Sequence, residues 1–209
     1  MAKSRRKPVD PARRVIERTL GLAAERGWRR VGLADIAAAA KLPLVELYRL
    51  YPSRSAILGA FVRHIDEAVL AKGEAEGETA RERLFDLLMR RFEALRPYRE
   101  GVGAILRDCG GDPFSLLCGG ARLKRSLAWT LEAAGLGSHG LLGKARLKGL
   151  ALVYLATLRV WLGDEGPDLS RTMAALDKNL GRAEAVIGLC RRLGGRGHRE
   201  GSETAASAA

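Results

Sequence analysis

The most informative stretch of the sequence covers residues 33–54 and reads LADIAAAAKLPLVELYRLYPSR. Its apolar residues recur every three or four positions, which is the period of an α-helix. Pro43 suits a first helical turn, and Pro52 should end a helix because the residue before a proline avoids the helical region. The pattern predicts two short helices over 33–39 and 43–50. Joined by a tight turn, they form a helix-turn-helix.

The flanking residues extend this pair into a compact helical unit. Upstream, Asp10 is a candidate N-cap and Pro11 a first helical residue, and Gly27 should end the helix at Arg26. The expected inner face of this helix holds Val15, Thr19, Leu22 and Ala23, and Trp28 and Val31 should anchor the following turn in the core. Downstream, Ser53 is predicted to cap a helix over residues 54–72.

The charge of the chain is concentrated in this N-terminal unit. The 209 residues carry a formal net charge of +12. Residues 1–65 hold 14 Lys and Arg against 5 Asp and Glu, a net of +9, whereas residues 66–209 hold 22 against 19, a net of +3. Such asymmetry favours a nucleic-acid partner held by one end of the protein. Residues 1–9 are expected to form a disordered basic arm.

The remainder of the chain also has the helical period. It predicts helices over 80–96, 98–107, 113–134, 141–163 and 169–193, and a disordered tail over 194–209. Residues 72–79 read KGEAEGET and indicate a corner between domains. We therefore expect an all-α protein with an N-terminal three-helix helix-turn-helix domain over 10–72 and a C-terminal helical bundle over 79–193.

Three runs in the N-terminal unit carry a resemblance to a known family. They are AAERGW at 23–28, LADIA at 33–37 and LYRLYPSRSAIL at 47–58. Together they resemble the start of TetR-family transcriptional regulators. The resemblance implies a one-component regulator, expected to be a repressor, that binds operator DNA as a homodimer and is released by a small apolar ligand.

The same resemblance assigns DNA-binding positions. Tyr48 matches the tyrosine that closes the recognition helix and touches a phosphate, and Arg54 stands where the family usually has lysine. Lys41 replaces the usual glycine of the turn, and Glu46 places a negative charge on the recognition helix. The expected DNA-binding residues are Arg5, Arg6, Lys41, Leu44, Val45, Tyr48, Arg49 and Arg54, with Arg49 the candidate for a guanine or phosphate contact.

The C-terminal bundle is expected to pair two protomers and to enclose the ligand. The resemblance implies pairing through the helices predicted over 141–163 and 169–193. The candidate interface residues are Leu150, Val153, Leu176, Leu180 and Ile187. Five aromatic residues could line an apolar ligand cavity or simply form core; they are Phe92, Phe114, Trp129, Tyr154 and Trp161.

A second resemblance supports a different function. Residues 160–173 read VWLGDEGPDLSRTM, and with Leu176 and Leu180 they resemble the C-terminal region of the isoprenoid-binding accessory proteins of ubiquinone biosynthesis. Those proteins share the TetR fold but have no DNA function. The alternative is therefore a lipid-binding accessory protein without specific DNA binding. The acidic residues of this segment fit an inter-helix turn, in which Asp168 can cap the last helix.

Other classes of protein find no support in the sequence. The three cysteines are widely spaced and form no Cys-x-x-Cys pair, so neither a zinc site nor a disulfide framework is expected, and a reducing cytoplasm is the natural compartment. The longest apolar run, residues 149–158, is too short to span a bilayer. The sequence has no catalytic constellation and no phosphate-binding loop, so we expect neither an enzyme nor a cofactor.

Overall fold

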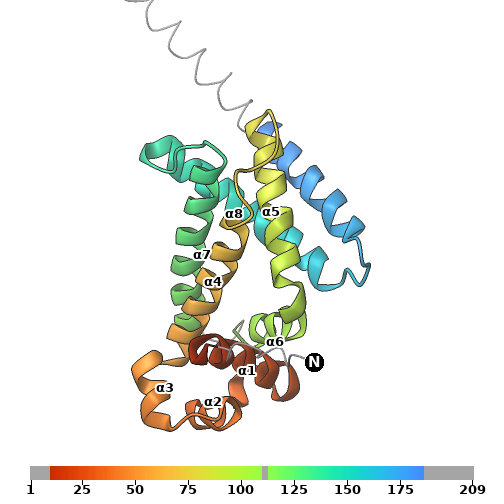
Figure 1. The fold of residues 1–209 in the computed structure, drawn as a ribbon. Coiled ribbons are helices and arrows are strands. Elements are labelled where there is room, and N and C mark those ends of the chain that lie inside the picture. The colour runs from red at the N-terminus through yellow and green to blue at the C-terminus, as the bar shows by residue number, and fades with distance from the viewer. Residues whose placement is uncertain (1–9, 110–112, 186–209) are drawn as a thin grey trace, which may run out of the picture.

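The computed structural model describes residues 10–109 and 113–185, with the side chains of 109–119 excepted, and every regular element in this part of the chain is helical. The elements and their bounds are α1 (Pro11–Arg26), the 3₁₀ turn η1 (Trp28–Arg30), α2 (Leu33–Ala40), α3 (Leu44–Leu50), α4 (Arg54–Leu70), α5 (Ala80–Leu95), η2 (Arg96–Tyr98), α6 (Arg99–Cys109), α7 (Pro113–Ala133), α8 (Gly140–Leu162) and a last helix over 170–185. The all-α expectation is confirmed. Figure 1 shows α1, α2 and α3 gathered at one end of the molecule, with α4, α5 and α7 running away from them.

The N-terminal unit forms as its caps and apolar spacing predict. The Ala12 amide donates to the Asp10 carboxylate over 3.1 Å, and the Ala56 amide donates to the Ser53 hydroxyl over 3.1 Å, so both predicted N-caps are confirmed. Gly27 follows α1 with a φ of 80°, a conformation that favours glycine. The expected inner face of α1 is buried, as are Trp28 and Val31.

The turn between α2 and α3 contains a residue in a left-handed conformation. Lys41 has φ 54° and ψ 47°. The Lys41 amide donates to the Ala38 carbonyl over 3.0 Å, and the Leu42 amide donates to the Ala37 carbonyl over 3.0 Å. This pair of bonds defines a Schellman motif, whose left-handed position is usually glycine. The left-handed backbone at Lys41 therefore explains why glycine is usual at this position.

The third helix begins one residue later than predicted. Pro43 has ψ 145° and precedes α3 as its N-cap, so it is not in the first helical turn. Its carbonyl accepts hydrogen bonds from the Glu46 and Leu47 amides at 3.0 and 3.1 Å. The difference arises because the Lys41 turn leaves the chain extended at Pro43, and this proline then fixes the direction in which α3 leaves the turn.

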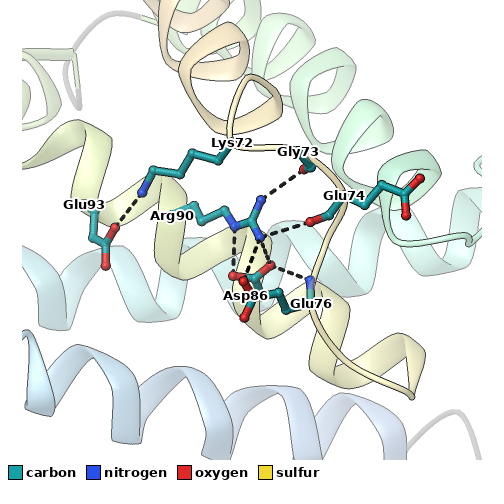
Figure 2. Close-up of polar contacts among 7 residues, drawn as sticks. All are labelled: Lys72, Gly73, Glu74, Glu76, Asp86, Arg90 and Glu93. Carbon is teal, nitrogen blue, oxygen red and sulfur yellow. Dashed lines mark hydrogen bonds and ion pairs between the residues drawn. The ribbon is translucent and has the colours of Figure 1, made fainter.

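The segment between α4 and α5, predicted as a corner between domains, is held against α5 by hydrogen bonds and ion pairs, here called the strap. The Arg90 guanidinium is buried and donates to the carbonyls of Gly73 and Glu74, each over 3.1 Å. Arg90 also pairs with Asp86, whose carboxylate accepts the Glu76 amide over 2.8 Å. Figure 2 shows this strap, which comprises Lys72, Gly73, Glu74, Glu76, Asp86, Arg90 and Glu93.

A second buried arginine joins three helices of the bundle. Arg91 of α5 pairs with Asp66 of α4, with an N–O distance of 2.6 Å, and also donates to the Ser126 hydroxyl of α7. Ser126 in turn donates to Asp66 over 2.7 Å. Buried charges need such partners, so Arg91 and Asp66 depend on each other. Their network links α4 to α5 and α7. Since α4 also packs on α1, it connects the two parts of the molecule.

The turn before the last helix is organised by a buried carboxylate. Asp164 accepts from the Thr172 amide over 2.8 Å and from the Thr172 hydroxyl over 2.7 Å. Burial alone would raise the pKa of Asp164, but the bonds from Thr172, together with a backbone bond from Gly166 and the charge of Arg171, hold that pKa below its ordinary value. Asp168 accepts the Ser170 amide over 3.3 Å. The last helix begins at residue 170, so Leu169 and not the predicted Asp168 is at its N-cap position, and Asp164 is the carboxylate that bonds Thr172 in the first turn.

Candidate nucleic-acid interface

The surface of α3 away from the core is the candidate DNA-reading face. Leu47 is the one residue of α3 that is buried, at 1% exposure. At about 100° per residue, Val45 and Arg49 lie about 160° from Leu47, on the opposite side of the helix. Tyr48 is 67% exposed and lies on one flank, and Glu46 is exposed on the other. The helix-turn-helix therefore presents a free outer face, as base reading requires.

The N-terminal unit carries several exposed cationic side chains. Arg29 and Arg30 of η1, Lys41 of the turn and Arg49 of α3 are all exposed. Arg29 is tied down, because its amide and its guanidinium donate to Asp108 of α6 at 3.0 and 3.2 Å. The sequence alone could not predict that Arg29 bonds α6, since Asp108 lies 79 positions away. Lys41 and Arg49 provide positive charge at α3, which is suited to a phosphate backbone.

Arg54 has a different position from the one expected. Its guanidinium lies over the Trp28 ring at 4.4 Å, and it donates to the Trp28 and Val31 carbonyls over 3.2 and 2.7 Å. These contacts turn it toward the inside of the N-terminal unit, because the carbonyls that end η1 need donors. The guanidinium of Arg54 therefore braces η1 against α4, and its assignment as a phosphate contact stays a prediction. Arg5 and Arg6 lie outside the described residues.

The aromatic residues predicted to line a cavity pack on one another. Phe92 stacks on Tyr154, with ring centroids 5.6 Å apart, and lies 6.0 Å from Trp161. All three are buried, and burial raises the pKa of Tyr154. Trp129 is 60% exposed and lines a separate groove between α4 and α7. The side chain of Phe114 lies outside the described part of the chain.

A cavity does open in the bundle, at a different place. It has a volume of about 460 Å³ and lies between α5, α7, α8 and the last helix. Its wall is mainly aliphatic, with three charged residues, and comprises Ala80, Arg81, Leu84, Leu131, Leu136, Arg146, Gly149, Leu150, Val153, Leu180, Ala183 and Glu184. The size is within the range of small-molecule sites. Aliphatic residues distant in sequence form it, which is why the search for aromatic residues missed it.

The predicted dimer residues point into the protomer. Leu150, Val153, Leu176 and Leu180 are each at most 5% exposed, and three of them line the cavity. Ile187 lies outside the described residues. The prediction was wrong for these four. Leu150 and Val153 were misassigned because α8 is apolar on more than one side, so that periodicity does not separate its inner stripe from an outer one, and Leu176 and Leu180 of the last helix also face into the protomer. The exposed apolar residues of these helices are instead Leu141, Leu142, Leu152, Leu155 and Met173.

The segment that resembles lipid-binding accessory proteins has structural roles in this chain. Trp161 and Leu176 are completely buried, and Asp164 and Thr172 form the cap described above. Packing and capping account for the distinctive residues of the segment. In the part of the chain that the structure describes, no helix combines the length and the apolar character needed to cross a bilayer.

Comparison with solved structures identifies the fold. No protein-family model and no curated protein matches the sequence. A TetR transcriptional regulator from Nitrosomonas europaea matches with a TM-score of 0.69 and 24% identity, over 84% of this chain and 99% of its own. One from Rhodococcus sp. RHA1 has a TM-score of 0.61 and 20% identity, over 83% and 94%. Thermus thermophilus FadR, a TetR-family repressor in complex with lauroyl-CoA, matches with a TM-score of 0.52 and 21% identity, over 82% of this chain and 92% of its own. The chain has the fold of TetR-family transcriptional regulators, and the comparisons do not favour the lipid-binding alternative.

Proposed function

We propose that this protein is a one-component transcriptional repressor that binds operator DNA as a dimer and is released by a small apolar ligand. The observation that carries the proposal is α3, in which Leu47 is the one buried residue, Arg49 is exposed and the preceding turn carries the exposed Lys41. A helix presented in this way fits the major groove, which is wide enough to admit it.

Each exposed polar or charged residue of the face has a defined task in this proposal. Arg49 projects away from the core and can bond the two acceptors of a guanine. Tyr48 on the flank and Lys41 in the turn are placed for phosphates, and Arg5 and Arg6 of the N-terminal arm add contacts along the backbone. Glu46 opposes phosphate approach on its flank, so the register of α3 in the groove is constrained by repulsion as well as attraction.

The primary test compares specific and general DNA binding. The full chain is titrated onto the DNA upstream of its own gene and onto a scrambled duplex, each at two salt concentrations. We expect tighter binding to the upstream DNA, and Arg49→Ala should reduce the difference between the two duplexes. Equal and steeply salt-dependent binding to both would contradict the proposal. An isoprenoid that co-purifies with a chain lacking DNA selectivity would support the lipid-binding alternative instead.

The proposed dimer uses the outer face of α8 and the last helix. Leu152 of α8 is 70% exposed. Leu155, one turn later on α8, and Met173 of the last helix are also exposed. Unpaired leucines of this kind on one surface favour association with a second copy. In such a dimer the two α3 helices would enter major grooves about 34–36 Å apart, one turn of DNA.

The dimer is tested by the mass of the protein in solution. Leu152→Glu should convert the dimer to a monomer and abolish tight binding to a two-half-site operator. Leu106→Glu is the matched control, because Leu106 is 41% exposed on α6, away from the proposed interface. A dimer that persists in Leu152→Glu, measured by light scattering, would remove this face from the proposal.

The cavity between α5, α7, α8 and the last helix is the proposed ligand site. Its aliphatic wall suits an apolar molecule, and Arg146 provides a cation for an acidic end, whereas Arg81 is already paired with Asp177 and Glu184. The similarly folded FadR was solved with lauroyl-CoA, a ligand that combines an apolar chain with anionic groups. A ligand here would act on DNA binding by favouring one protomer geometry over another.

A filled cavity provides the test. Gly149 lines the cavity and an added Cβ there meets no described atom within 4 Å, so Gly149→Leu should place its side chain in the cavity. The anionic fluorophore anilinonaphthalene sulfonate is the probe, and Gly149→Leu should weaken its binding at least tenfold. Gly120→Leu is the control, because Gly120 of α7 also has open space but does not line the cavity. Unchanged probe binding in Gly149→Leu would exclude this site.

A further inference from the structure

The DNA-facing surface of α3 has little capacity for hydrogen bonding. Leu44 and Val45 are each 55% exposed, and Leu50 is 40% exposed. Of the outward residues only Glu46, Tyr48 and Arg49 have polar side chains. An exposed cluster of aliphatic side chains on a seven-residue helix is unfavourable in water unless a partner covers it. The question is which apolar group of DNA could do so.

The major groove offers a single apolar group on its base edges. Every purine and cytosine edge presents donors or acceptors, whereas thymine also presents its 5-methyl group. Aliphatic side chains cannot bond the polar edges, and covering those edges would leave donors and acceptors unpaired. We propose that Val45 and Leu44 read thymine methyl groups, so that the protein selects thymine next to the guanine read by Arg49. This inference rests on the proposed DNA-binding function.

The geometry of α3 limits where the thymines lie. Val45 and Arg49 are one turn apart on the outward side, which is a rise of about 6 Å. Stacked bases on a strand are about 3.4 Å apart, so the thymine read by Val45 and the guanine read by Arg49 lie within about two base steps. Leu44 lies on the same flank as Tyr48, about 100° around the helix from Val45. It therefore reaches a base beside the first thymine, nearer to the strand that Tyr48 contacts.

The charges around α3 favour DNA over an apolar protein as the occupant. Lys41 in the turn before the helix and Arg49 on the helix itself are exposed, and the N-terminal 65 residues carry a net charge of +9. A polyanion with an apolar group at the floor of its groove complements both features. A protein partner with an apolar surface would complement only the leucine and the valine.

The test replaces single methyl groups of the operator. The preferred half-site is first selected from random duplexes with the full-length protein, and each thymine in it is then changed to uracil, which pairs identically but lacks the methyl group. Affinity should fall about fourfold for each contacted thymine, the value of one buried methyl group. Val45→Ala should abolish this effect at one thymine position and Leu44→Ala at another.

Two controls separate this inference from the proposed function. Leu50→Ala removes an exposed leucine from the other flank, at the far end of α3, and should leave every thymine-to-uracil ratio unchanged. Circular dichroism and thermal melting confirm that each variant is folded. A selective operator whose affinity is insensitive to uracil at every position would overturn methyl reading while leaving the regulator intact. Failure to select any sequence would overturn both.

Discussion

Replacing Lys41 by glycine should stabilise the protein while weakening its binding to DNA. Lys41 has φ 54° and ψ 47° at the left-handed position of the Schellman motif. For a residue with a Cβ, this conformation costs about 1–2 kcal/mol. Glycine avoids that cost but loses more backbone entropy on folding, about 0.5–1 kcal/mol. Subtracting the two ranges gives an expected gain in the free energy of unfolding of about 0–1.5 kcal/mol, and the midpoint of about 0.75 kcal/mol corresponds to about 1.5–3 °C in Tm for a chain of this size.

The assay is urea denaturation of the wild type, Lys41→Gly and Lys41→Ala. Alanine keeps the Cβ and the strain while removing the ammonium group, so the difference between the two variants isolates the backbone term. Both variants lose the same charge, and both should reduce the salt dependence of DNA binding by about one counterion if Lys41 contacts a phosphate. The reasoning would be refuted if Lys41→Gly were no more stable than Lys41→Ala.

Three further predictions follow from packing, charge and bracing. Gly101→Ala should destabilise the chain by about 1–3 kcal/mol, since the added Cβ would lie 2.5 Å from the Leu20 carbonyl oxygen. Gly120→Ala is the matched variant: its Cβ meets no described atom within 4 Å, so it should stabilise α7 by about 0.5–1 kcal/mol. Thermal melting of the two variants and the wild type measures both effects. Asp164→Ala should cost about 1–2 kcal/mol at pH 7. The folded-state pKa of Asp164 is lowered, so its contribution is present above the unfolded pKa and is lost as pH falls below about 4, and denaturation at pH 7 and pH 3 should show that cost shrinking. Arg54→Ala should lower the free energy of unfolding by about 2–3 kcal/mol. Arg54→Lys should be nearly as unstable, because lysine keeps the charge but cannot stack a planar group on Trp28. If Arg54→Lys instead restored the DNA affinity lost in Arg54→Ala, Arg54 would be a phosphate contact.

Those parts of the fold that depend on neighbouring residues were predictable. Asp10 and Ser53 cap helices within two or three positions of themselves, and Gly27 ends α1 with a positive φ. These interactions are local, so residue type and spacing contain the necessary information. The exposed residues of α3 were predicted for the same reason, because one buried position, Leu47, sets the direction of the whole helix.

The roles of several predicted site residues depended on distant parts of the chain. Arg54 is at a helix N-terminus, as phosphate-binding residues often are, but Trp28 and Val31 occupy its guanidinium. Leu150 and Leu180 have the helical period of an interface, yet they face a cavity inside the protomer. An apolar period says that a side chain is covered, and it does not distinguish cover by the same chain from cover by a partner.

The sequence by itself determined that this protein is helical, that a helix-turn-helix lies near its N-terminus and that most of its excess positive charge belongs to that end. Helix period, caps and charge are properties of neighbouring residues, so they could be interpreted without a structure. Only the tertiary structure decided which apolar residues are free for a partner, where the bundle leaves a cavity and which arginines are already occupied. These depend on contacts between residues tens of positions apart, such as Arg29 with Asp108 and Arg91 with Asp66, and the packing of the helices alone brings such pairs together.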